Sequence, residues 1–362
     1  MEETPTMDLP LKTADWLMKG PAFVRYRALE DLLPAVVTVR DAYALRAALT
    51  TEPLVAGLID EVNAWEEQPP IKNHNNAAHP LHKLVFLAEI GVPAARLQPA
   101  IDTILAHQSR EGPFQVRSSL PRAFGGDGRE RWTWFATDAP LISYALVKLG
   151  LGNDDRVRRS VDYILSRQED YGSPCYADPT HGPEFNGPGK RDEPCPYASL
   201  ITLRLFSALP ELRESAAADR LIDCLLQHWS ERRTGRKHYL FGIGTTFGRP
   251  KAPRIWYDIV HFADVLSRFP RCRYETAFAE LLDHLRSKRD TDGRVKAESV
   301  WLKWNPDGRS SKQPKGDEEF PAGQVVGDDL VNWSGWEFVQ KRRPSRWLTL
   351  LVWTILKRAG DA

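Results

Sequence analysis

Two aspartates and two tyrosines have the type and placement for acid–base chemistry. Asp138 and Asp258 each stand directly before an apolar segment, where a helix is expected to begin. A carboxylate at that position can cap the helix by accepting N–H groups of the first turn. It can also act as a general acid if burial raises its pKa. Tyr197 and Tyr257 lie next to the starts of such segments and complete the candidate catalytic residues.

Two cysteines and two histidines form the candidate metal set. Cys175, His181 and Cys195 belong to one stretch of the chain, and His79 or Asp138 could complete the set. Thiolate and imidazole ligands suit zinc, and three such ligands leave a fourth position open for catalysis. The spacing matches no zinc-finger or zinc-ribbon signature, so ordinary cysteines with a loop histidine remain the alternative. A possible zinc ion is the only cofactor that the sequence suggests.

Charged and aromatic residues near the same helix starts could bind a substrate. His82 follows His79 at the spacing of one helical turn, so both could face one direction. Arg346 follows the basic run 341–343 and could bind a diphosphate or carboxylate at a helix N-terminus, with a solvated charge run as the simpler alternative. The aromatic residues that could cover an apolar ligand are Trp347, Trp336 and Phe338.

Four aspartates, spaced 60, 61 and 60 residues apart, mark the repeat that must position these side chains. Each lies among apolar residues at the spacing of one helix face, which predicts an amphipathic outer helix. The segments between them are largely apolar, and a helix that is apolar on most sides is buried. A further inner helix near Pro21 could close against the last one. The aspartates are Asp102, Asp162, Asp223 and Asp283, and the inner helices are expected at 81–90, 141–149, 197–209, 259–269 and 347–356.

The connections between these helices differ in length. Those from inner to outer helices are short, whereas those from outer to inner helices run roughly over 109–137, 169–194, 230–255 and 290–344. In a ring of alternating helices all the long loops fall on one face, and loops of that length are typically functional. We therefore expect an all-α fold, a single α/α toroid of about six helical hairpins spanning residues 1–362, with a long loop insertion at 290–344.

One turn of the repeat contains Ile104-Leu105, Gln108, Gly112 and Phe114, and Gln168 and Gly172 form a second copy. This pattern resembles the repeat of triterpene cyclases and protein prenyltransferases. In their repeat a helix ends in glutamine, which is followed by a glycine and an aromatic residue. The resemblance covers roughly residues 20–358, and it implies an α/α toroid with a central apolar cavity and a prenyl- or terpenoid-like substrate.

The catalytic motifs of those families are not matched by this chain. The Asp-x-Asp-Asp motif of squalene-type cyclases has only Asp290-Thr-Asp292-Gly293 as its counterpart. The Asp-x-Cys zinc pair of the prenyltransferases has Glu193 in place of its aspartate, before Cys195. Because a fold does not determine a function, the reaction is left open.

Three functions are compatible with these residues. The first is an enzyme that converts an apolar small molecule in the cavity, by acid chemistry of the carbocation type or with the help of a metal ion. The second is a non-catalytic lipid- or peptide-binding protein or an interaction scaffold. The third is a zinc-dependent Cys/Cys/His enzyme that resembles the lanthionine cyclases, which are toroids as well.

Composition narrows the expected partners and location. The net charge of +1 argues against a nucleic-acid footprint or a polybasic membrane patch. No apolar run is long enough to span a bilayer, and residues 1–19 lack the pattern of a secretory signal. The four cysteines then suggest reduced thiols in the cytoplasm. An apolar small molecule is the expected partner, and the oligomeric state is not predicted.

Overall fold

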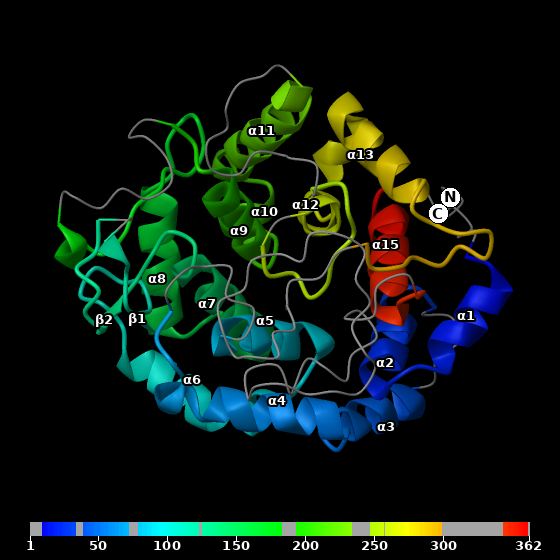
Figure 1. Cartoon of the computed structure of the whole chain (residues 1–362), viewed down its shortest axis with the longest axis horizontal. Coiled ribbons are helices and arrows are strands. Elements are labelled where there is room, and N and C mark those ends of the chain that lie inside the picture. Colours follow the sequence, from blue (N-terminus) through cyan, green and yellow to red (C-terminus); the bar gives the residue numbers. More distant parts are fainter. Residues whose placement is uncertain are drawn as a thin grey trace. The chain divides into compact units, whose positions relative to one another are not determined.

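A computed structural model describes most of the chain and shows that helices dominate it (Figure 1). The predicted all-α class is therefore confirmed. Within the described residues, the strands form one small antiparallel pair, β1 (Val116–Ser118) and β2 (Arg131–Thr133), with Val116 opposite Thr133. The described residues are 9–33, 39–71, 79–122, 125–182, 193–233, 247–256, 258–298 and 343–360.

The chain divides into two compact units. Unit 1 combines residues 1–58 with 245–362, and unit 2 comprises residues 59–244. The predicted single domain and closed toroid stay predictions, and each unit is described by itself. The helices of unit 1 are α1 (Leu11–Met18), α2 (Ala22–Asp31), α3 (Val39–Leu49), α12 (Ile259–Leu266), α13 (Thr276–Arg286) and α15 (Arg346–Arg358). Those of unit 2 are α5 (Pro80–Ile90), α6 (Gln98–Ala106), α7 (Ala139–Leu146), α8 (Asp155–Ser166), α9 (Pro196–Phe206), α10 (Pro210–Arg213) and α11 (Ala216–Ser230), while α4 (Pro53–Asn63) crosses the boundary.

Buried and amphipathic helices alternate within each unit, as predicted. Every residue of α5, α7, α9 and α12 is buried, and so is α15 from Trp347 to Leu356. The four repeat aspartates lie on α6, α8, α11 and α13, and all four are exposed. In unit 2, α7 packs between α5 and α9, and α8 and α11 cover α7 and α9. A single-sided apolar stripe can be buried only by such a neighbour.

The buried helices begin where they were predicted to begin, but three of them end earlier than predicted. Pro80, Pro140 and Pro196 lie in the first turn, where the missing N–H of proline costs no helix hydrogen bond. The helices α7, α9 and α12 end about three residues earlier than predicted. After α7 the chain continues as the π-helical segment Val147–Leu151, in which Gly150 takes a positive φ of 92°.

The two ends of the chain meet in unit 1. α15 packs against α2 and α12, and α1 contacts α15 (Figure 1). Lys357 Nζ donates to the carbonyl oxygen of Asp31 at 2.8 Å, which satisfies the C-terminal end of α2. Trp353 Nε1 of α15 donates to Gly293 O at 2.8 Å, in the turn that follows α13. The predicted packing of the N-terminal helix near Pro21 against the last buried helix is thus confirmed.

The glutamine and glycine of the repeat link one hairpin to the next. Gln108 Nε2 donates to Arg156 O at 2.7 Å, at the start of α8. Gly112 has a φ of 128°, and a Cβ there would lie 2.7 Å from Arg159 O. Only glycine fits this turn, because the backbone is in the left-handed region and the neighbouring helix is in contact. The motif therefore holds α6 and α8 together.

Candidate functional site

Several of the candidate catalytic and metal-binding side chains cap the buried helices. His79 Nδ1 accepts the N–H of Leu81 at 3.1 Å, and Cys195 Sγ accepts that of Ala198 at 3.4 Å. Asp258 Oδ1 accepts the N–H of His261 at 2.9 Å. Each bond satisfies a donor that the first turn of a helix leaves without an intrahelical partner. Some of the residues that the sequence singled out for catalysis or metal binding therefore act as helix caps.

The Asp258 carboxyl group has a raised pKa because it is buried. It is 1% exposed at the start of α12, and burial raises its pKa to about 6. The neighbouring ammonium of Lys251 and the N–H groups of His261, Val260 and Lys251 oppose that rise. Desolvation disfavours the charged carboxylate more than these groups favour it. With a pKa of about 6, the Asp258 carboxyl group is partly protonated near neutral pH, which a general acid requires.

Lys251 is the partner that sequence reasoning missed. It is 3% exposed, and burial lowers its pKa while the charge of Asp258 raises it. Lysine is almost never fully buried unless it is paired. The proline-rich segment around it predicted only a loop, so its neighbourhood could not be seen before the structure. We call Asp258, Lys251 and the loop 247–256 the Asp258 site.

The loop of the Asp258 site is attached to α12 at both of its ends. Phe247 O accepts the N–H of Ile259 at 3.0 Å, and the rings of Phe247 and Phe262 pack edge to face at 5.5 Å. At the other end, Arg254 pairs with the carboxylate of Asp264, two turns along α12. The loop that contains Lys251 is therefore held against α12 at both of its ends.

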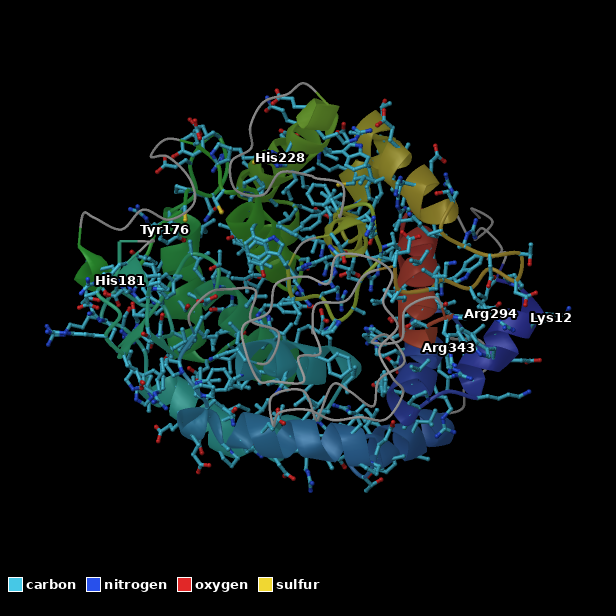
Figure 2. The ribbon with its side chains drawn as sticks, in the orientation of Figure 1. Lys12, Tyr176, His181, His228, Arg294 and Arg343 are labelled. Carbon is cyan, nitrogen blue, oxygen red and sulfur yellow. The ribbon has the colours of Figure 1, made fainter. Side chains whose placement is uncertain are left out.

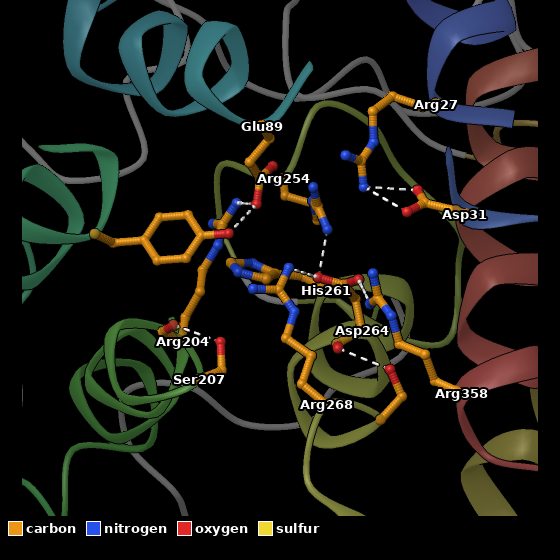
Figure 3. A network of polar contacts seen from close by, with 12 residues as sticks. Arg27, Asp31, Glu89, Arg204, Ser207, Arg254, His261, Asp264, Arg268 and Arg358 are labelled. Atoms are coloured by element: carbon orange, nitrogen blue, oxygen red, sulfur yellow. Dashed lines mark hydrogen bonds and ion pairs between the residues drawn. The ribbon is translucent and has the colours of Figure 1, made fainter. Parts of the chain in front are cut away.

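Asp264 is the centre of a buried ionic network in unit 1 (Figure 3). Its side chain is 2% exposed, and it pairs with Arg268 at 2.7 Å and with Arg358 at 3.0 Å, besides Arg254. A buried carboxylate needs such partners because desolvation is costly. The sequence offered one signal for this network. Asp264 is an acidic residue inside an apolar segment, and Arg268 follows it at i+4.

A second buried network joins three helices of unit 2. Glu89 of α5 accepts from Tyr144 Oη of α7 at 2.8 Å and from Arg204 Nη2 of α9 at 2.6 Å (Figure 3). The Arg204 guanidinium also lies 4.9 Å from the centroid of the Tyr144 ring. The pair Glu89 and Arg204 is separated by 115 residues, so no local pattern could predict it. This network fixes the relative positions of α5, α7 and α9.

Asp138 and Tyr197 are brought together in unit 2. Asp138 is buried at the start of α7, and the pKa of Tyr197 is raised by burial first and then by the nearby Asp138 carboxylate. The predicted capping by Asp138 is wrong, because no N–H of the first turn donates to its side chain. The Thr137 hydroxyl donates to Asp138 Oδ1 at 3.4 Å instead. Tyr197 therefore keeps its proton near neutral pH.

The four predicted metal ligands do not form a metal centre in the structure. All four are described, and the described residues contain no group of three or more His, Cys, Asp or Glu side chains that could hold a metal ion. His79 and Cys195 cap different helices, as shown above. His181 is labelled in Figure 2. Its Nε2 lies 2.8 Å from Thr133 Oγ1, and its ring stacks on that of Phe135 with the centroids 5.2 Å apart. Cys175 is half-buried, and none of the four cysteines forms a disulfide.

The predicted substrate-binding residues have other contacts where they are described. His82 is buried in α5. Arg346 Nε donates to Trp16 O at 3.0 Å, and its guanidinium lies 4.6 Å from the centroid of the Trp16 ring, so it ties α15 to α1. Trp347 is buried against Phe23, with ring centroids 5.5 Å apart. Tyr257, Trp336 and Phe338 lie outside the described residues.

Comparison with known proteins adds no relative. No protein-family model matches the chain, and no curated protein matches it significantly. Among the described helices, none combines the length and the apolar character that crossing a bilayer requires. The resemblance to the cyclases and prenyltransferases stays a prediction, and function has to be argued from the residues themselves.

Proposed function

We propose that the chain is an enzyme that protonates an apolar, isoprenoid-like small molecule, with Asp258 as the general acid. The observation that carries this proposal is the burial of Asp258 together with its pKa of about 6. A carboxyl group with such a pKa is partly protonated near neutral pH and can both donate and recover a proton. Ordinary surface aspartates are fully ionised there.

The chemistry follows from the surroundings of the carboxyl group. Proton transfer from Asp258 to an alkene, epoxide or allylic oxygen leaves a carboxylate, which the ammonium of Lys251 stabilises. The positive charge that develops on the substrate is favoured by aromatic ring faces, and Phe247 and Phe262 flank the start of α12. Burial keeps water from capturing the cation.

The proposal includes a closed α/α toroid as the scaffold. Buried and amphipathic helices alternate in both units, and the chain ends pack together in unit 1. A ring built from such hairpins would place the starts of its buried helices around one opening, where Asp258 begins α12. The positive ends of their dipoles would favour an anionic or ionised group there.

The test is a conversion assay with candidate substrates. The full chain is incubated with linear polyprenyl alkenes, their terminal epoxides and polyprenyl diphosphates, and products are identified by gas chromatography and mass spectrometry. We expect conversion of at least one compound, and a roughly 10²–10⁴-fold lower rate for Asp258→Asn. Asp154→Asn is the matched control, because Asp154 caps the amphipathic helix α8 and should leave the rate unchanged.

Each other outcome contradicts a stated part of the proposal. Undiminished conversion by Asp258→Asn would exclude Asp258 as the acid. Tight binding of a probe without conversion would favour the non-catalytic binding protein. Conversion that requires added zinc would favour metal-assisted chemistry instead of acid chemistry.

A further inference from the structure

The loop of the Asp258 site is bonded to two helices at its first residues. Toward α12, Phe247 O accepts the N–H of Ile259 at 3.0 Å. Toward α13, His284 Nε2 lies 3.1 Å from the next carbonyl oxygen of the loop, that of Gly248. A carbonyl oxygen can only accept, so this ring nitrogen carries a hydrogen and donates it. Two successive carbonyl groups of the loop are therefore held by different helices.

The imidazole ring of His284 lies directly against the loop. A Cβ atom at position 248 would be only 2.9 Å from His284 Nε2, so the glycine makes the close approach of the ring possible. Both the protonated ring and the neutral ring with its hydrogen on Nε2 can donate to a carbonyl oxygen. The contact between α13 and the loop is therefore compatible with either charge state of His284, including at the pH values where Asp258 titrates.

A second bond holds the middle of the loop. Pro250 O accepts the N–H of Glu298 at 3.0 Å, and the Glu298 carboxylate pairs with Lys288 Nζ at 2.8 and 3.1 Å. Lys288 follows His284 by four residues, so both anchors come from the C-terminal end of α13 and the residues just after it. The loop is thus fastened on both sides of residue 249.

The residue after these anchors contacts the acid. The backbone N–H of Lys251, which directly follows Pro250, donates to the Asp258 carboxylate. We propose that His284 is a positioning residue that holds this part of the loop against Asp258 and so keeps water away from its carboxyl group. The inference rests on the proposed function only for its catalytic consequence, because the position of the loop can be measured without a substrate.

The position of the loop decides how far the Asp258 carboxyl group is hydrated. Burial is the largest contribution to its raised pKa, and the Lys251 ammonium and the N–H bonds oppose it. A loop released at Gly248 would admit water, and hydration favours the charged carboxylate. Because burial is the dominant contribution, we expect loss of the His284 bond to lower the pKa of Asp258 from about 6 toward 3.8.

The test combines backbone hydrogen exchange with the titration of Asp258 in the full chain. In His284→Ala, the amides of Lys251 and Ile259 should exchange at least about tenfold faster than in wild type at pH 7, because local opening exposes them. The titration midpoint of the Asp258 carboxyl group, followed by ¹³C NMR, should fall by at least about 0.5 pH unit. If Asp258 is the acid, the decline of the conversion rate with rising pH should move to lower pH by the same amount.

Two variants serve as controls for His284→Ala. His284→Gln keeps an N–H donor that can reach Gly248 O, so it should retain the wild-type exchange rates and midpoint. His107→Ala removes another half-buried ring that bonds a backbone carbonyl group, since His107 Nδ1 lies 2.9 Å from Thr103 O, but in unit 2. This variant should leave the loop and the Asp258 midpoint unchanged.

Three results would overturn the inference. Wild-type exchange of the Lys251 amide as fast as that of Lys12, in the first turn of α1, would show that the loop is not held, whatever the variants do. An unchanged Asp258 midpoint in His284→Ala would show that the ring does not control the carboxyl group. An equal fall in His284→Gln would assign the effect to packing of the ring and not to its hydrogen bond.

The outcomes also separate this inference from the proposed function. If the Asp258 midpoint falls in His284→Ala while the wild-type chain converts no compound, the positioning role stands and the proposed function fails. If Asp258→Asn loses conversion while His284→Ala keeps the wild-type midpoint and pH profile, the proposed function stands and the positioning role fails.

Discussion

Asp258 combines two roles that make opposite demands on its charge. As a helix cap, its carboxylate accepts the N–H of His261. Burial favours its neutral form. The effect of burial exceeds that of the hydrogen bonds and of the Lys251 charge, so the pKa of Asp258 rises to about 6. Asp154 shows the other balance, since Arg156 lowers the pKa of this partly exposed cap. Identical residue types at equivalent cap positions therefore differ in protonation through their surroundings.

The raised pKa of Asp258 implies a cost in stability that a substitution should remove. Between the unperturbed value of 3.8 and about 6, the folded state binds more protons than the unfolded state, so stability falls as pH rises through this window. Above it the cost is constant, at about 3 kcal/mol. Asp258→Asn has no charge to bury and can still cap α12. We expect it to be up to about 3 kcal/mol more stable than wild type at pH 7–8, and no more stable at pH 4.

Urea unfolding of both proteins at pH 4, 5, 6, 7 and 8 checks this expectation. Asp154→Asn serves as the control, because the pKa of Asp154 is lowered and its ionisation therefore favours folding. This control should show no gain at neutral pH. An Asp258→Asn protein that is less stable than wild type at pH 7 would show that ionised Asp258 stabilises the fold.

At the scale of elements, short turns and buried networks determine how the helices are held. The turn after α6 contacts α8 through Gln108 and Gly112. In unit 2, Glu89 and Arg204 connect α5 to α9 in the same way that the Asp264 network connects α12, α15 and the loop of the Asp258 site. Each link joins elements that are distant in sequence, so the hairpins are not independent units.

Substitution of Gly112 tests the contact between neighbouring hairpins. In Gly112→Ala the new Cβ would meet Arg159 O at 2.7 Å in a backbone conformation with φ of 128°. Strain and overpacking together should cost about 2–4 kcal/mol. Gly128→Ala is the control, because Gly128 also has a positive φ, 76°, but nothing lies within 4 Å of its Cβ position.

Thermal and urea unfolding of the two variants measure this difference. The control should lose only about 1 kcal/mol, from backbone strain alone. Equal losses in both variants would mean that the contact with α8 contributes nothing, and the repeat turn would then be a local feature of α6.

At the scale of the whole molecule, the repeat was predictable and the polar interior was not. The spacing of Asp102, Asp162, Asp223 and Asp283 predicted the exposed face of four amphipathic helices, and the largely apolar segments predicted the buried ones. Periodicity reports burial directly, because burial is what selects apolar residues. The packing of α2 against α15 could be predicted from the same repeat.

The candidate site was predictable only in part. Asp258 could be found because a helix start has a local signature, whereas Lys251 lies in a loop whose conformation has none. The ligand set of Cys175, His181, Cys195 and His79 failed to assemble among the described residues because two of its members cap separate helices. Partners such as Arg204 for Glu89 depend on tertiary contacts between distant segments.

The proposed function depends most directly on the protonation of one carboxyl group, and that can be measured without a substrate. The chain is labelled with ¹³C at the aspartate side-chain carboxyl groups, and the Asp258 signal is assigned by its absence from the spectrum of Asp258→Asn. Its chemical shift is then followed from pH 3 to pH 8. The account predicts a titration midpoint at about 6. A midpoint at or below 4 would contradict it, because Asp258 would then be an ordinary ionised helix cap.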